Sequence, residues 1–141
     1  MPSDEIVSAL KPEVLEVISS IGEISIDTIL KDGLLKDIPI IGTLFSVYKM
    51  GVNIQNAIFI RNISTFLYEL KKNKFSEISF DLLSKLESDE GYRIKVSDTI
   101  LILNAKFNSQ KKAKIHACIL LALAENKIDI KEFELIRNFS I

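Results

Sequence analysis

The feature that most constrains the fold is the spacing of apolar residues, which recur three or four positions apart along most of the chain. This spacing places their side chains along one face of an α-helix, whereas a half-buried strand needs apolar residues at every second position. No strict alternation of that kind is sustained anywhere in the sequence. The spacing therefore predicts an all-α fold without a convincing strand.

The stripes divide the chain into about six expected helices joined by short connections. Pro12 fits the first turn of the first helix, because proline lacks an N–H that would be unbonded there in any case. Pro39 fits the start of the second helical segment, which we expect to be either a pair of helices or one long helix with a bend at Gly42 or Gly51. With 141 residues the chain suffices for one domain, so we expect a single bundle over residues 1–141. The expected helices lie within residues 10–28, 39–70, 75–87, 92–107, 113–124 and 133–139. Their apolar stripes include Leu10, Val14 and Val17 in the first, Phe75, Ile78, Leu82 and Leu86 in the third, and Tyr92, Val96, Ile100, Leu103 and Phe107 in the fourth.

Two segments are apolar on most sides. Residues 113–124 interrupt their apolar run only with Lys114 and His116, which predicts a central helix surrounded by others. Residues 38–60 are long enough to cross a bilayer, but Lys49 and three amides lie in the middle, where polar groups are costly. We interpret residues 38–60 as buried helix, with insertion into a membrane interface as the alternative.

Charge composition limits the kinds of partner. Eighteen basic and nineteen acidic residues give a formal net charge of -1, so a nucleic-acid partner is not expected. The lysine-rich runs 71–74 and 111–114 are interpreted as solvated helix ends. The N-terminus carries Asp4 and Glu5 where a secretory signal would be basic, and no apolar signal core follows. The sequence therefore predicts a cytoplasmic location.

Residues suited to catalysis are few. The single histidine, His116, and the single cysteine, Cys118, are two positions apart and would not face each other on a helix. His116 is expected at the surface or partly buried, and Cys118 is expected as a small buried packing residue. Arg61 and Lys49 are the nearest candidates for a charge on an apolar face, and we expect them to snorkel or pair with a carboxylate. The five glycines form no phosphate-binding loop. The chain is therefore predicted not to be an enzyme and to need no cofactor.

One acidic turn permits two interpretations. Glu125, Asp129 and Glu132 lie in a short polar segment between two expected helices, where their oxygens could hold a divalent cation. Alternatively, Asp129 begins the last helix and Glu132, three residues later, completes a capping box. The capping box is the favoured interpretation, and the metal site remains open.

Residues 113–136 resemble the helix-turn-helix of TerB-like domains, the tellurite-resistance type. In that family an alanine-rich helix leads into an acidic turn followed by a downstream glutamate, and the usual Asp-Gly pair stands here as Glu125-Asn126. The resemblance implies an all-α, cytoplasmic, non-catalytic domain, often tied to bacterial stress or phage-defence systems near membranes. Carried over by position, it singles out Glu125, Asp129 and Glu132.

These observations favour a non-enzymatic interaction or regulatory module that binds a protein partner or itself. The chain is rich in apolar residues for its size, and excess apolar surface usually marks a contact site. Two alternatives stay open. One is a peripheral membrane protein that uses the apolar stretch 38–60, and the other is a metal-regulated TerB-like domain.

Overall fold

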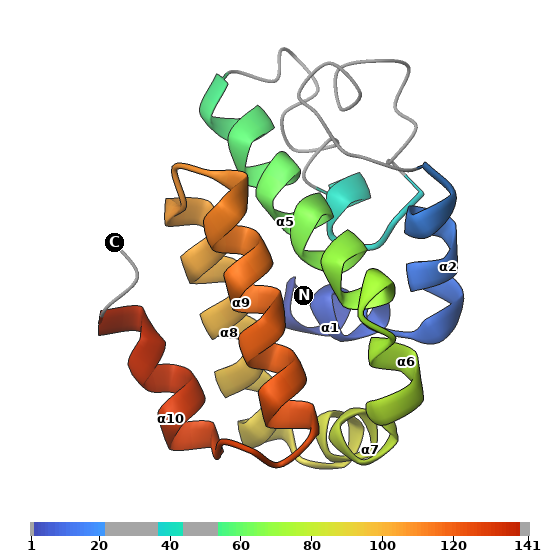
Figure 1. Cartoon of the computed structure of the whole chain (residues 1–141), viewed down its shortest axis with the longest axis vertical. Coiled ribbons are helices and arrows are strands. Elements are labelled where there is room, and N and C mark those ends of the chain that lie inside the picture. The colour runs from blue at the N-terminus through green and yellow to red at the C-terminus, as the bar shows by residue number, and fades with distance from the viewer. Residues whose placement is uncertain (1, 22–36, 44–53, 139–141) are drawn as a thin grey trace.

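The computed structural model describes residues 2–21, 37–43 and 54–138, and helices are the regular secondary structure throughout these ranges (Figure 1). The all-α prediction is confirmed. The expectation of about six helices is not, because the described residues form more and shorter helices than the stripes indicated. They are α1 (Pro2–Ala9), α2 (Pro12–Ile21), α5 (Ile54–Lys72), α6 (Phe75–Ile78), α7 (Phe80–Ser88), α8 (Glu90–Lys106), α9 (Gln110–Ala124), α10 (Ile130–Leu135) and a 3-10 turn, η1 (Ile136–Asn138).

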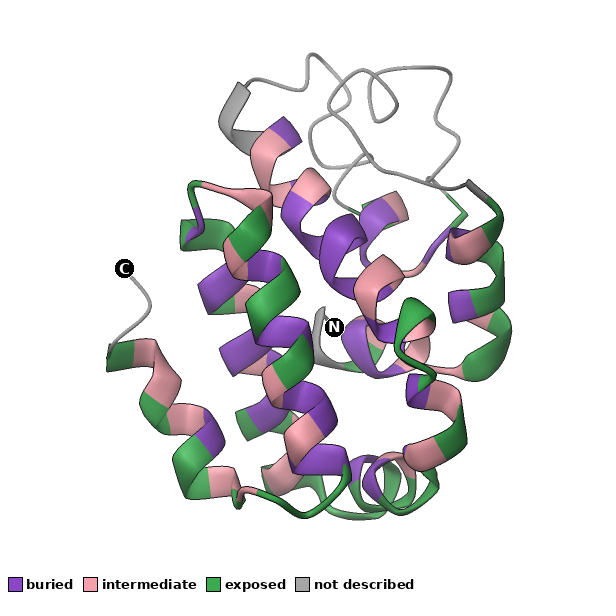
Figure 2. Ribbon diagram, viewed as in Figure 1, coloured by how far each residue is buried: buried purple, intermediate pink, exposed green. Residues whose placement is uncertain are grey.

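Helices α5 and α9 lie side by side and share the most extensive contact among the described helices. Helices α2 and α8 pack against α5, while α6, α7 and α10 pack against α9, so other helices cover one side of α9. The prediction that α9 is surrounded by other helices is not confirmed, because Lys114, Ile115 and Cys118 on its other side are exposed. Figure 2 shows buried residues on the sides of α5, α8 and α9 that face the interior, and exposed residues along the outer side of α9. One cluster of buried residues runs from α1 to α10, and its large members include Phe66, Phe75 and Phe133.

The N-terminal region differs from the predicted single helix. Helix α1 was not anticipated, and its Ile6 and Leu10 are fully buried. A turn at residues 10–11 separates α1 from α2, and α2 begins at Pro12 as predicted. Val17, expected on the inner face of this helix, is 49% exposed, while Leu15 and Ile18 are fully buried. The spacing therefore identified a helix but assigned the wrong face. The expected end of this helix, near residue 28, lies outside the described residues.

The apolar stretch 38–60 is described only in part, since residues 44–53 lie outside the described ranges. Pro39 lies in a turn, and residues 41–43 form a helical turn. Ile38, Ile40 and Ile41 are buried in the main cluster, and α5 supplies buried Ile60. These side chains are covered by protein, so they are not free to enter a membrane interface. Across the described residues, none of the helices combines the length and apolar character needed to cross a bilayer.

The segments after α5 follow their predicted stripes more closely. Phe75, Leu82 and Leu86 are buried as expected, although Ser79 separates α6 from α7. The inner stripe of α8 is likewise confirmed, with Val96, Ile100, Leu103 and Phe107 buried. The Asp89 side chain accepts a hydrogen bond from the backbone N–H of Tyr92 at 3.0 Å and so caps the start of α8.

The two lysine runs lie at opposite kinds of helix end. Lys71 and Lys72 occupy the last turn of α5, where the helix dipole favours positive charge. Lys71 Nζ lies 2.7 Å from Glu16 Oε1, and this hydrogen bond lowers the pKa of the Glu16 carboxyl. Lys111 and Lys112 instead lie at the start of α9, and the preceding Ser109 makes no side-chain cap. The positive charges of Lys111 and Lys112 therefore lie at the positive end of the α9 dipole, which is unfavourable.

A buried amide fixes the C-terminal end of α8. Asn62 on α5 donates from Nδ2 to the carbonyl oxygens of Asn104 and Phe107, both at 2.9 Å. The last carbonyls of a helix have no partner within it, so this side chain supplies a bond that the helix cannot make. Arg61 donates to the Asn62 Oδ1 atom at 3.2 Å instead of pairing with a carboxylate of the described residues. These contacts hold α8 against α5 and fix the side of α8 that faces outward.

Candidate functional site

The predicted acidic turn between α9 and α10 contains a complete capping box. Asp129 Oδ1 accepts from the Glu132 N–H at 2.8 Å, and Glu132 Oε1 accepts from the Asp129 N–H at 3.0 Å. The favoured interpretation of this pair is therefore confirmed. Glu125 is exposed and forms an ion pair with Lys127 at 3.5 Å. All three carboxylates have partners within the turn itself.

The backbone explains why the turn carries asparagine. Asn126 adopts a φ of 60°, in the left-handed region that asparagine tolerates better than most residues. The Asn126 N–H donates to the Leu123 carbonyl at 3.1 Å, and the Lys127 N–H donates to the Ala122 carbonyl at 2.9 Å. This pair of bonds is a Schellman motif, which satisfies the final carbonyls of a helix. Asn126 thus performs the backbone role that glycine commonly has at such a position.

The metal interpretation has no matching geometry within the turn. Among the described residues, which include Glu125, Asp129 and Glu132, no three His, Cys, Asp or Glu side chains gather closely enough to hold a metal ion. A hard cation such as calcium takes six to eight oxygen ligands. One oxygen of Asp129 and one of Glu132 already accept backbone hydrogen bonds. The turn is therefore described as a helix junction.

A shallow groove of about 380 Å³ runs beside this junction. Tyr92 on α8 and Leu123 on α9 contribute to its lining, and Lys85 on α7 lies with its Nζ atom 4.4 Å from the centre of the Tyr92 ring. That distance is within cation–π range. Partial burial is the main cause that raises the pKa of the Tyr92 hydroxyl. The groove thus has an internal contact between its charged and aromatic groups.

His116 is buried, which corrects the prediction of a surface or partly buried residue. Its ring stacks with those of Phe66 and Phe133, and Phe107 meets it edge-on with ring centroids 6.0 Å apart. Neither ring nitrogen has a hydrogen-bond partner among the described residues. Burial lowers the pKa of His116 to about 3, so the imidazole is neutral at physiological pH. A neutral ring among three phenylalanines serves packing.

Cys118 is exposed, so the prediction of a buried packing cysteine is wrong. It lies on the outer side of α9, and His116 lies on the inner side, as expected for residues two positions apart on a helix. The two side chains therefore make no nucleophile–base pair. Apolar residues occupy nearly every position around Cys118, so they fall on both the buried and the exposed side of α9. Their spacing therefore could not show on which side Cys118 lies.

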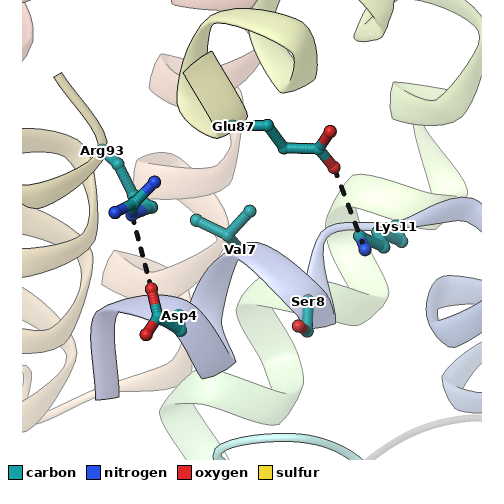
Figure 3. A pocket seen from close by; sticks show the side chains of 6 residues that line it. All are labelled: Asp4, Val7, Ser8, Lys11, Glu87 and Arg93. Atoms are coloured by element: carbon teal, nitrogen blue, oxygen red, sulfur yellow. Dashed lines mark ion pairs between the residues drawn. The ribbon is translucent and has the colours of Figure 1, made fainter. Parts of the chain in front are cut away.

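A second hollow, a charged cleft of about 370 Å³, lies where α1 meets α7 and α8 (Figure 3). Asp4 lies 3.4 Å from Arg93 Nε, and Glu87 lies 3.8 Å from Lys11 Nζ, with Val7 between the two pairs (Figure 3). Arg93 also donates to the Leu86 carbonyl at 3.2 Å. The charges thus neutralise one another across the cleft, and they tie the N-terminal helix to its neighbours.

The outer face of α8 is the strongest candidate for a contact surface. Ile94 and Ile102 are 41% and 37% exposed, and Ala105 is also exposed. Because residues four, seven, eight and eleven positions apart share a face of a helix, these side chains form one surface. Asp98 and Leu101 lie on the same face and are half-buried. We define the α8 outer face as Gly91, Ile94, Lys95, Asp98, Leu101, Ile102 and Ala105.

Each of the other exposed large apolar side chains among the described residues is the only such side chain on its helix. Phe80, Ile115, Leu135 and Val17 lie on four different helices. Single exposed apolar residues are normal on protein surfaces. On α8, by contrast, two exposed large apolar side chains, Ile94 and Ile102, share one face of the helix.

Sequence reasoning missed the α8 outer face, although a signal was present. The stripe from Tyr92 to Phe107 accounts for the buried side of α8, and Leu101 packs partly against the core, which leaves Ile94 and Ile102 without a role. Apolar residues off the main stripe of a helix indicate a second contact surface. The side of α8 that becomes buried depends on the helices that pack against it, which are α1, α5, α7 and α10.

Comparisons with known proteins returned no family model, no curated protein and no solved structure that matches this chain. The resemblance of residues 113–136 to TerB-like domains therefore stands on its own residues alone.

Proposed function

We propose that this protein is a non-enzymatic interaction module that binds another protein molecule through the α8 outer face. The observation that carries the proposal is the exposure of Ile94 and Ile102, two large apolar side chains on one face of a helix. Removing apolar surface from water stabilises a complex by roughly 25 cal/mol per Å² before the costs of association. A protein partner that covers this face would provide that gain.

The arrangement of the face supports a protein as the occupant. Gly91 and Ala105 are small, so another helix can approach the backbone of α8 closely. Charged residues border the apolar positions, with Glu90 at one end and Lys106 at the other. Asp98 lies at the centre of the face between the apolar residues, so the α8 outer face mixes apolar and polar side chains, as interfaces of proteins that associate reversibly commonly do.

The use of the titratable side chains supports a non-catalytic role. Asp129 and Glu132 cap α10, while His116 packs between aromatic rings. One ion pair of the charged cleft connects α1 to α8, and the other connects the turn after α1 to α7. Each of these titratable side chains has a structural role that explains its position. The resemblance to TerB-like domains supports a place for such a module in a bacterial stress or phage-defence system in the cytoplasm.

Site-specific photocrosslinking in the cells that make the protein tests this function. A photoreactive amino acid replaces Ile102 in one variant and the exposed Ser84 on α7 in a matched control. We expect a discrete protein adduct from position 102 and none from position 84. Equal labelling at both positions, or no adduct at position 102, would contradict a role for the α8 outer face.

A further inference from the structure

We infer that the partner of the α8 outer face is the same face on a second copy of this chain, with the two α8 helices antiparallel about a two-fold axis. This inference rests on the proposed function and names its partner. Two-fold dimers are the commonest symmetric assemblies, and each requires a surface complementary to itself.

The charges at the ends of α8 satisfy this requirement. Glu90 lies in the first turn and Lys106 in the last turn, and both are exposed. Neither forms an ion pair with another described residue. Glu90, Ile94, Asp98, Ile102 and Lys106 follow one another at intervals of four along one row of α8. When the rows of two antiparallel copies lie along each other, at a helix crossing of about -50°, Glu90 of each copy lies beside Lys106 of the other, which produces two charge contacts. Opposed helix dipoles also attract when helices pack side by side.

The apolar residues match in the same register. When Asp98 of the two copies meets at the axis, residues whose numbers add to 196 lie opposite each other. Ile94 then faces Ile102 of the second copy, and Gly91 faces Ala105. Every residue of the α8 outer face has a counterpart in this register, including Lys95 opposite Leu101. A pairing of large with large and small with small fills the contact evenly.

Gly91 gives independent support for close approach by another helix. Glycine lowers the stability of a helix relative to alanine, because it leaves the unfolded chain more conformational freedom. The fold itself does not require glycine here, because an added Cβ atom would meet only the Asp89 carboxylate, at an ordinary distance of 3.6 Å. A second α8 helix against this position explains the missing side chain, because it would occupy the space next to the backbone.

The inferred dimer is weak. The contact rests on one helix of 17 residues per copy, so it buries less than the roughly 1,600 Å² of a standard interface. Two Asp98 carboxylates also meet near the axis, and like charges opposite each other oppose association. Lys95 precedes Asp98 by one helical turn and offsets part of this repulsion. We therefore expect a dissociation constant in the micromolar range.

Sedimentation equilibrium of the full chain from about 1 µM to about 1 mM tests the dimer. Wild-type protein is expected to shift from monomer to dimer across this range. Glu90→Lys and Lys106→Glu are each expected to weaken the dimer at least tenfold, because each places like charges together. An equimolar mixture of the two variants is expected to restore dimers, because opposite charges then meet at both ends of the contact between unlike copies.

Matched control variants separate the contact from effects on helix stability. Glu13→Lys changes an exposed residue in the first turn of α2, and Lys72→Glu changes one in the last turn of α5. Both variants oppose a helix dipole in the same way as the α8 variants, and both are expected to dimerise like wild type. Dimers that persist in both α8 variants would overturn the inference.

Disulfide trapping provides a second measurement. In a Cys118→Ser background, Asp98→Cys is expected to oxidise to a covalent dimer, and Ser84→Cys, which lies outside the face, is expected to remain largely monomeric. A wild-type chain that stays monomeric to about 1 mM, with no disulfide-linked dimer through position 98, would overturn the second-copy inference. In that case, a photoadduct at position 102 with a different protein would leave the proposed function standing, and no adduct would end both.

Discussion

The ring of Phe133 stacks on the ring of His116, with centroids 5.4 Å apart and planes inclined by 29°. Phe133 is the buried residue of the short helix α10, and His116 lies on the inner side of α9. Arg137 Nε donates to Thr99 Oγ1 on α8 at 3.0 Å and adds one polar contact from η1. The C-terminal helix is thus joined to α9 through a neutral imidazole, and it also packs against α8.

Stability is expected to depend on pH through His116. Its pKa is about 3 in the folded chain and about 6.5 in the unfolded chain, so between these values the unfolded state binds more protons. The free energy of unfolding therefore falls as the pH drops from 6.5 toward 3, by at most about 1.4 kcal/mol per pH unit. Chemical denaturation of wild type and His116→Leu at several pH values measures this difference. The contribution should vanish in the variant, and equal slopes for both proteins would refute this role.

Truncation of Phe133 is expected to detach α10. Phe133→Ala removes a fully buried ring and leaves a cavity against His116, which costs about 3–5 kcal/mol. Water then reaches the imidazole, so its pKa rises toward 6.5, as NMR titration of the ring protons would show. Leu135→Ala on the same helix is the control, because Leu135 is half exposed and its loss should cost about 0.5 kcal/mol or less. A similar loss of stability in the two variants would contradict the stack as the main anchor.

The helical character of the chain could be predicted because it depends on local spacing. The stripe Val96, Ile100, Leu103 and Phe107 was correctly placed in the interior, and so were Phe75 and Leu86. The capping box at Asp129 and Glu132 was also predictable, since its two hydrogen bonds span only three residues. Patterns whose partners lie within one helical turn are visible in a sequence.

Features that depend on distant neighbours were not predictable in this way. The orientation of α2 is set by α5, so Val17 faces solvent although its spacing fits the inner stripe. His116 and Cys118 lie in the same apolar run, and only the packing of α9 determines which of them is buried. The α8 outer face is exposed because the described helices that contact α8 pack against its other sides. No spacing rule supplies that information.

Asn62 is expected to be important for stability despite its polarity. Asn62→Ala leaves the carbonyls of Asn104 and Phe107 without the amide donor, at a cost of about 1–3 kcal/mol. Asn73→Ala is the matched control, because Asn73 also donates to a helix carbonyl, that of Glu69, but at an exposed position where water can replace it. Thermal or urea unfolding compares the two variants. Equal destabilisation would show that the buried bonds are no more costly to lose than the exposed one.

The acidic turn is expected to act as a cap and not as a cation site. Asp129→Ala removes the side-chain acceptor of the Glu132 N–H, and loss of such a cap typically costs about 1 kcal/mol. Glu132→Gln keeps an oxygen that can accept from the Asp129 N–H but removes the charge that a divalent cation requires, so its stability should stay close to wild type. Addition of calcium, magnesium or manganese should leave the melting temperature of all three proteins unchanged, because only a ligand that prefers the folded state raises it. A metal-dependent rise in wild type that is absent in Glu132→Gln would instead establish a cation site at this turn, and the capping role would then be secondary.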